Sequence, residues 1–243
     1  AIKDYEHISQ VSGRLMSFAY LNYAKNLSDI NNVAFYQDIS EKVNQSMTNL
    51  VFYDIEINKI KEVILQKMLQ NSTELNFYRA FLRDVRAFKK HNLSEDLEKL
   101  FIEKSSTAKN AWVRLFDETM ADLKFSYNDK ILSCSEIFNL LSNPDEEVRK
   151  NAAESIGKTL KENSKIFAYI TNVLAKDKSI EDQWRIFSKP ISSRNLSNFI
   201  EDNVVDNLIT TVQENYPKIS HRYYKIKAKM LGKKKLQQHD RNA

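Results

Sequence analysis

Glycine and proline are unusually scarce in this sequence, and their scarcity limits the folds open to it. The 243 residues include only three of each, against average usage of about 7% for Gly and about 5% for Pro. Turns that need a positive φ must therefore be rare, which favours long helices. The glycines (Gly13, Gly157 and Gly232) are also too far apart to build a dinucleotide-binding or phosphate-binding loop. We therefore predict an all-α fold.

Apolar residues recur every three or four positions along most of the chain, the spacing of one-sided helices. In the first helix, 5–26, the predicted stripe includes Ile8, Val11, Leu15, Phe18 and Leu21. We expect Asn58 to cap a short helix that carries Ile60, Val63, Ile64 and Met68. Further helices are predicted at 33–50, 75–88, 144–178, 201–216 and 218–231. Another is predicted at 95–123, where Ser105 and Ser106 can interrupt it.

One segment has the pattern of a β-hairpin. In KFSYNDKILS, Asn128 and Asp129 separate two short alternating arms. Ser133 and Glu136 then have the spacing of a capping box, and Asn143 and Pro144 are expected to start the long helix at 144. The predicted fold is a multi-helix array of long antiparallel helices, with at most one short hairpin near 125–132.

The basic residues gather at the end of the chain. Nine of the 37 Lys and Arg residues lie in 216–243, against one carboxylate, Asp240. The net charge of +5 is therefore a property of this tail. Nucleic-acid binding is one interpretation, with Tyr223 and Tyr224 stacking on bases. The favoured interpretation is core packing, with the basic side chains on the solvated back, because the following residues form a helical stripe: Tyr216, Ile219, Tyr223, Ile226 and Met230.

No catalytic apparatus can be identified from the residues alone. The histidines (His7, His91, His221 and His239) lack metal-site spacing, so we expect them at the surface or at helix ends. No nucleophile-elbow sequence occurs, and the many carboxylates suit helix first turns. We assign no catalytic and no metal residue, and leave the substrate-binding residues unknown.

The sequence also indicates the cellular compartment and whether the chain can span a membrane. The single cysteine, Cys134, is expected to be a half-buried thiol, which suits a reducing compartment, and we expect a cytoplasmic location. No apolar run is long enough to span a bilayer, so no membrane partner is predicted. A HEAT-like helical scaffold remains an alternative, because NPDEEVRKNAAESIG has the pattern of such repeats, although no second copy follows at the expected spacing.

Three longer motifs stand out towards the end of the sequence: SRNLSN (193–198), ENYPKISHRYYKIKAK (214–229) and DRNA (240–243). They resemble the oligoendopeptidase F family, relatives of thimet oligopeptidase. AWVRLFDETMADLKF, LLSNPDEEVRKNAAESI and IEDQWRIFSKPISSRN are similar to the family in the same order, and YEHISQVSGRLMSFAYLNYA resembles an earlier family helix. The resemblance covers nearly the whole chain. It departs from the family at LGKKKLQQHD, where members more often carry an acidic residue and an aromatic.

The resemblance implies a cytoplasmic zinc metallopeptidase that hydrolyses short peptides in a deep cleft. In that family an H-E-x-x-H helix and a downstream Glu hold the zinc. These motifs do not occur in the sequence, so we expect a middle fragment, inactive alone, whose C-terminal catalytic half is missing. By the resemblance, 1–124 is a helical N-terminal lobe portion, and 125–243 begins the catalytic domain. The expected partners are short peptides and the missing half, with no specific nucleic acid.

Overall fold

The computed structural model describes all residues, 1–243. Helices account for 76% of the chain and strands for 2%, which confirms the all-α prediction. The chain divides into two compact units. The first consists of 1–118 and 172–199, and the second of 119–171 and 200–243. The chain passes between the units inside two helices, α8 and α11, as well as after Phe199.

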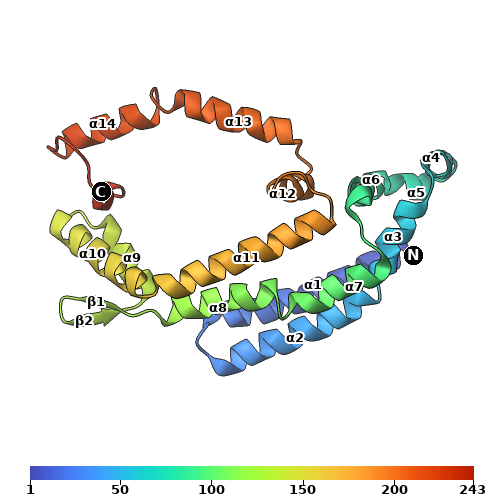
Figure 1. Ribbon diagram of the computed structural model, residues 1–243, viewed down its shortest axis with the longest axis horizontal. Helices are drawn as coiled ribbons and strands as arrows, with labels where there is room; N and C mark the ends of the chain where they lie inside the picture. The colour runs from blue at the N-terminus through green and yellow to red at the C-terminus, as the bar shows by residue number, and fades with distance from the viewer. The chain divides into compact units, whose positions relative to one another are not determined.

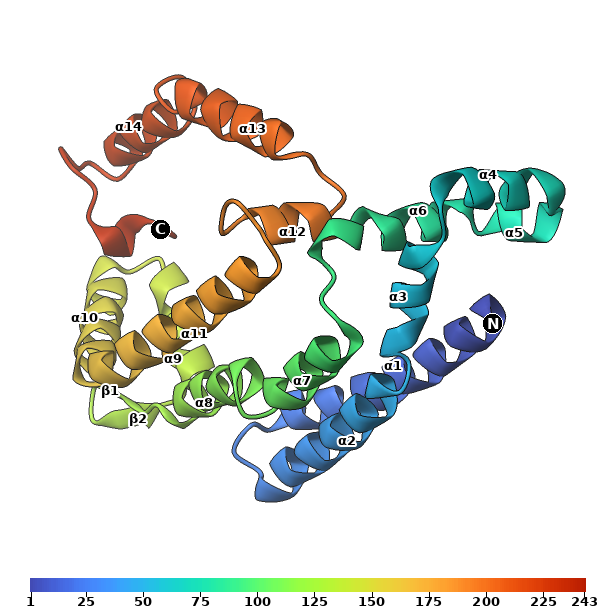
Figure 2. The same cartoon turned by 45° about the vertical axis from the view of Figure 1, so that its right-hand side comes forward.

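The first unit begins with an antiparallel pair of long helices, α1 (Ile2–Lys25) and α2 (Ile30–Thr48), which lie side by side in Figures 1 and 2. The Asp29 side chain accepts hydrogen bonds from the amides of Asn31 and Asn32 and so caps α2. The buried face of α1 was predicted wrongly. The residues of the expected stripe are mostly exposed, and the buried positions are Ala19 and Tyr23. A small residue such as Ala19 allows a close helix approach, and Tyr23 stacks on Tyr36 of α2 with the ring centroids 4.9 Å apart.

Shorter helices complete most of the first unit: α3 (Val51–Lys59), α4 (Glu62–Asn71), α5 (Thr73–Phe77), α6 (Arg79–Ala87), the 3-10 turn η1 (Lys89–His91) and α7 (Glu95–Ser105). Figure 2 shows α4 and α5 next to each other. Four buried residues form the core of these helices: Ile57, Leu65, Leu69 and Leu82. The Arg86 guanidinium donates to the carbonyls of Ile57 and Ile60 at 2.8 and 2.9 Å, and so satisfies the C-terminal end of α3.

The prediction that Asn58 caps a helix is wrong. Asn58 lies inside α3, is 5% exposed, and the next helix starts at Glu62 with no side-chain cap. Apolar residues lie on several sides of α3, so no one-sided stripe marks it in the sequence. In α4 the buried residues are Leu65 and Leu69, whereas Val63, Ile64 and Met68 are exposed.

The predicted interruption at Ser105 and Ser106 is present. It separates α7 from α8 (Lys109–Asp122), and the Ser105 hydroxyl donates to the carbonyl of Ile102 at 2.7 Å. The unit also contains the C-terminal part of α11 (Ser164–Trp184) and the short helix α12 (Ser192–Ser197).

The second unit contains the predicted hairpin. Strands β1 (Phe125–Tyr127) and β2 (Lys130–Leu132) pair antiparallel, with Phe125 opposite Leu132. Asn128 and Asp129 have φ of 45° and 59°, as a two-residue type I′ turn requires. The predicted capping box follows, with Ser133 and Glu136 at the start of α9 (Cys134–Asn139). Cys134 is half-buried, as expected, and burial raises the pKa of its thiol.

The long helix predicted at 144–178 is two helices, α10 (Glu146–Glu162) and α11, which meet at Asn163. The Asn163 amide donates to the carbonyl of Thr159 at 2.9 Å, a local bond that competes with helix continuation. The cap of α10 is Asp145 rather than Asn143, because the Asp145 side chain accepts from the Glu147 amide at 2.9 Å. The apolar face of α10 packs against β1 and α9, and the core of the unit contains Leu123, Phe125, Ile137, Ala152 and Ile156.

The predicted final helices are present as α13 (Asp202–Asn215) and α14 (Ser220–Met230). Gly232, with φ of 66°, ends α14 in the left-handed conformation, and the Lys233 amide donates to the carbonyl of Ala228 at 2.8 Å. The expected core stripe of α14 is exposed, however, and its buried residues are Lys227 and Ala228.

No helix of the chain is both long and apolar enough to cross a bilayer. The two compact units differ from the consecutive segments 1–124 and 125–243, because each unit combines two separate stretches of sequence. The assignment of those segments to a lobe portion and to the start of a catalytic domain stays a prediction.

Candidate functional site

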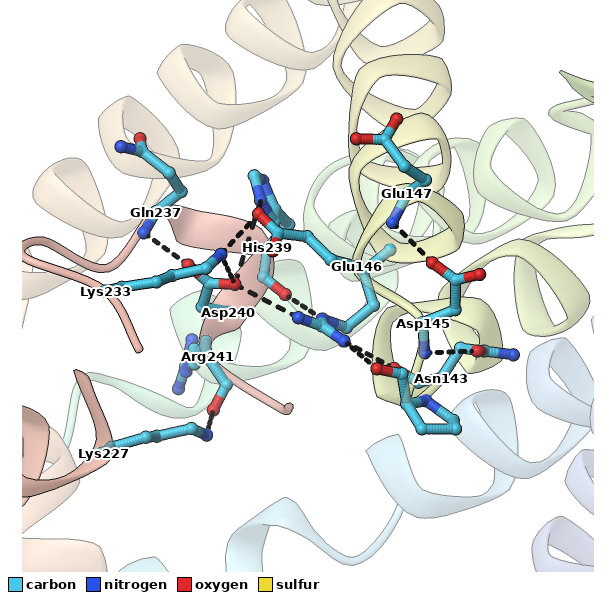
Figure 3. Close-up of polar contacts among 12 residues, drawn as sticks. Asn143, Asp145, Glu146, Glu147, Lys227, Lys233, Gln237, His239, Asp240 and Arg241 are labelled. Atoms are coloured by element: carbon cyan, nitrogen blue, oxygen red, sulfur yellow. Dashed lines mark hydrogen bonds and ion pairs between the residues drawn. The ribbon is translucent and has the colours of Figure 1, made fainter. Parts of the chain in front are cut away.

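The second unit buries a network of charged side chains where the end of the chain meets α10 (Figure 3). Asp240, in the 3-10 turn η3 (Gln238–Asp240), is completely buried, and Arg149 of α10 is 2% exposed. The Arg149 Nη2 donates to the Asp240 Oδ1 at 3.2 Å. Its other nitrogens donate to the carbonyls of His239, Asn143 and Pro144 at 3.0, 2.8 and 2.9 Å. Arg149 therefore connects η3 with the chain just before α10.

A second cation completes the pairing of Asp240. The Lys233 Nζ donates to the Asp240 Oδ1 at 2.6 Å and also to the Glu146 Oε1. The Gln237 backbone amide donates to the Asp240 Oδ2 at 2.8 Å. Burial raises the pKa of Asp240, but the Lys233 ammonium, the Gln237 amide and the Arg149 guanidinium outweigh it and hold this pKa at about 2. Asp240 is therefore an ionised, paired carboxylate at neutral pH.

The sequence brings these groups together through the end of α14. α14 ends at Met230, Gly232 turns the chain in the left-handed conformation, and Lys233 comes next. The Lys227 Nζ, on the last turn of the helix, donates to the Arg241 carbonyl at 2.9 Å. Lys227 is only 8% exposed, although the sequence suggested that the basic side chains form a solvated back. Part of the basic tail thus holds the DRNA segment in place.

The same network contains the group of residues that by spacing could hold a metal ion. The ligand atoms of Glu146, His239 and Asp240 lie within 4.8 Å of one another. The Lys233 ammonium, however, already contacts one oxygen of each carboxylate. His239 Nε2 lies 3.6 and 3.9 Å from those oxygens, a separation that two ligands of one ion can have, so the obstacle to a metal ion is the ammonium rather than the distances. A divalent cation would have to displace Lys233, so these residues do not fit a zinc site.

Two of the four histidines, His91 and His239, are largely buried rather than on the surface, and both lie in the last turn of a short 3-10 helix, as the helix-end alternative allowed. His91 is 8% exposed and stacks on Phe187 with the ring centroids 3.9 Å apart. Its Nδ1 lies 2.7 Å from the carbonyl oxygen of Arg185. His239 is mostly buried beside Glu146, while His7 and His221 are exposed. Sequence spacing could not reveal His91, because its partners lie more than 90 residues away.

The network has the chemistry of a structural anchor rather than of a reaction site. Its carboxylate is buried and fully paired, and a carboxylate with a pKa near 2 is a weak general base at neutral pH. Sequence analysis missed Arg149, Lys227 and Lys233 as a group. The motif DRNA was singled out only by resemblance, although Asp240 is the carboxylate of this tail and so a visible candidate partner for its cations. The assignment of no catalytic and no metal residue to this chain stays a prediction.

The fold and the sequence of the chain were compared with those of known proteins. A crystal structure of oligoendopeptidase-F from Enterococcus faecium matches the whole chain with a TM-score of 0.87 at 21% identity, over 49% of that protein. The chain therefore has the fold of about half of that protein. The family model described as Oligopeptidase F matches residues 56–125.

Curated relatives extend the match along the chain. Oligopeptidase PepF of Bacillus subtilis is 24% identical over 90% of this chain, and group B oligopeptidase PepB of Streptococcus agalactiae is 26% identical over 86%. Along most of its length, the chain is similar in sequence to members of the oligoendopeptidase F family. It spans 33% and 36% of the length of these two relatives, and so about a third of each.

Proposed function

We propose that this chain is part of a peptidase that hydrolyses short peptides. The observation that carries the proposal is the agreement between the Oligopeptidase F family model and relatives named oligopeptidases that match most of the chain. Since the chain spans about a third of those relatives, the activity is proposed for the complete protein. No observation favours a HEAT-like scaffold or a nucleic-acid binder over this function.

The proposal includes a catalytic zinc ion held by residues outside 1–243. The resemblance to zinc peptidases supports it, and Glu146, His239 and Asp240 do not fit as ligands because the Lys233 ammonium already contacts one oxygen of each carboxylate. When bound, zinc would supply an activated water molecule for peptide hydrolysis. Within this chain, the role of the Arg149–Asp240 pair would be to fix the DRNA segment.

The exposed apolar residues of α13, of α14 and of the turn between them support the proposal that a further part of the protein packs on this unit. Large exposed apolar surfaces usually mark an interaction site. Leu208, Ile219 and Met230 are 62%, 66% and 81% exposed. The missing C-terminal half is the partner that we propose for this surface. We also propose a cytoplasmic location, which the single free thiol supports.

The test is hydrolysis of an internally quenched fluorescent peptide by the complete protein. We expect cleavage of the peptide, loss of activity with a chelator and recovery with zinc, and no cleavage of a stably folded protein. The 243-residue chain alone is the control and should be inactive. The gene beyond the codon for Ala243 should encode H-E-x-x-H. Turnover that a chelator leaves unchanged would overturn the zinc proposal, and a complete protein without peptidase activity would overturn the function.

A further inference from the structure

The first unit contains a pocket of about 480 Å³ among α3, α6 and α7. Asp54 and Asn58, one turn apart on α3, line one part of it, and the Glu98–Arg185 pair lines another. The pocket is far from the DRNA segment in sequence and shares no residue with the charged network of the second unit.

The polar groups of α3 in this pocket have no protein partner. Both side-chain polar atoms of Asn58, which is 5% exposed, are buried without a hydrogen bond, and so is the Oδ1 of Asp54. Buried polar groups are nearly always paired, and an unpaired one costs about 1–3 kcal/mol. Asn58 offers one acceptor oxygen and an amide nitrogen with two N–H donors, and Asp54 offers acceptors only. A ligand that pairs with these groups therefore needs several hydrogen-bond donors and at least one acceptor.

The charges that line the pocket indicate which charge the ligand carries. Arg185 donates to both oxygens of Glu98 at 2.8 and 2.9 Å, which neutralises this pair. Asp84 pairs with Arg83 at 2.8 Å. Asp54 is left without a cation, and burial together with the nearby Glu98 raises its pKa. A positively charged donor would relieve both burial and repulsion at Asp54.

The remaining lining is apolar and aromatic. Phe81, Phe88 and Phe199 contribute rings, and Val51 and Val85 contribute smaller surfaces. Such a lining suits an apolar body attached to the cationic group, since ligand pockets combine apolar walls with a few placed polar groups.

We propose that this pocket binds the amino-terminal residue of a peptide. The α-ammonium donates to Asp54 and to the Oδ1 of Asn58, the first carbonyl accepts from the Nδ2 of Asn58, and the first side chain packs on the phenylalanines. An amine on a lysine side chain has the same charge but lacks the adjacent carbonyl. The proposal rests on the proposed peptidase function for the choice of a peptide as the ligand.

The test is calorimetric titration of the full chain with three probes. Phenylalaninamide carries the ammonium, the carbonyl and the ring, and it contains no internal peptide bond to cleave. N-acetylphenylalaninamide removes only the ammonium, and N-acetyllysinamide moves the ammonium to the side chain. We expect saturable binding of phenylalaninamide and binding of the other two that is about tenfold weaker or more, since a charge-assisted hydrogen bond is worth about 1.5–3 kcal/mol.

Variants then locate the binding. Asp54→Asn keeps the shape and removes the charge, and it should weaken phenylalaninamide binding by about tenfold or more. Glu56→Gln is the matched control, because Glu56 is an exposed carboxylate on the same helix outside the pocket. This variant should bind phenylalaninamide as tightly as the unaltered protein does. Thermal melting of each variant verifies folding.

Three results would overturn the proposal. They are the absence of saturable phenylalaninamide binding at millimolar concentration, equal binding of the acetylated probe, and tighter binding of N-acetyllysinamide. The probe comparison uses the unaltered protein, so it decides the question even if a variant fails to fold. It also requires no hydrolysis, so a failed peptidase assay and a failed binding assay are separate results.

Discussion

The two compact units bury carboxylates in opposite ways. In the second unit, the buried oxygens of Asp240 accept from Arg149, Lys233 and a backbone amide, and its pKa falls to about 2. In the first unit, an oxygen of Asp54 and the amide of Asn58 are buried without partners, and the pKa of Asp54 rises. The same residue type is thus stabilised in one region and penalised in the other.

This difference separates an anchor from a binding site. A buried charge with all its hydrogen bonds made holds its neighbours together, and removing one member leaves the others uncompensated. An unsatisfied polar group lowers stability until a ligand satisfies it. The contrast predicts that substitutions around Asp240, in the second unit, destabilise the fold. Substitutions around Asp54, in the first unit, should change ligand binding instead.

The largest effect is expected from Arg149→Met. The substitution preserves much of the apolar stem, removes one of the three donors to Asp240, and leaves the carbonyls of Asn143, Pro144 and His239 without the guanidinium that donates to them. Breaking a buried ion pair in this way costs about 3–5 kcal/mol. Urea denaturation followed by circular dichroism measures the change in the free energy of unfolding.

Lys150→Met is the matched control for that experiment. Lys150 follows Arg149 on α10, and its only recorded ion pair, with Glu147 at 3.8 Å, is exposed. Such pairs contribute about 0–1 kcal/mol. Equal losses in Arg149→Met and Lys150→Met would remove the distinction between a buried anchor and an ordinary surface charge.

A smaller loss of folding stability is expected at low pH. Folding lowers the pKa of Asp240 from the usual 3.8 to about 2, so its contribution to stability is complete above about pH 4 and is lost as the pH falls towards 2. Thermal melting at several pH values should therefore show a gap between the unaltered protein and Asp240→Asn that narrows between pH 4 and pH 2. A gap of constant size over that range would show that the charge of Asp240 is not what stabilises the unit.

Local signals in the sequence were sufficient for part of the fold. Asn128 and Asp129 accept positive φ, Ser133 and Glu136 cap each other's backbone, and Gly232 ends α14, all through interactions among neighbours in the sequence. Patterns of this kind need no knowledge of distant segments. The hairpin, the capping box and the helix end were therefore predicted at their observed positions.

Side-chain environments set by distant segments could not be predicted in this way. Arg149 is buried because Asp240, 91 positions later, pairs with it, and Lys227 is buried because the Arg241 carbonyl accepts from it. The apolar stripe of α14 suggested the reverse, with the aromatic face inside. Asn58 looked like a helix cap because the apolar residues of α3 form no one-sided stripe, so its place in a pocket was also missed.

The most direct test of the contrast compares Asp240→Asn with Asp54→Asn in one urea denaturation series at neutral pH. Asp240→Asn should lower the free energy of unfolding by about 2 kcal/mol or more, because two cations lose their partner. Asp54→Asn should leave it unchanged or raise it slightly, because the relief of a desolvated charge offsets the loss of about 0.5 kcal/mol from the dipole of α3. A loss in Asp54→Asn as large as that in Asp240→Asn would contradict the account.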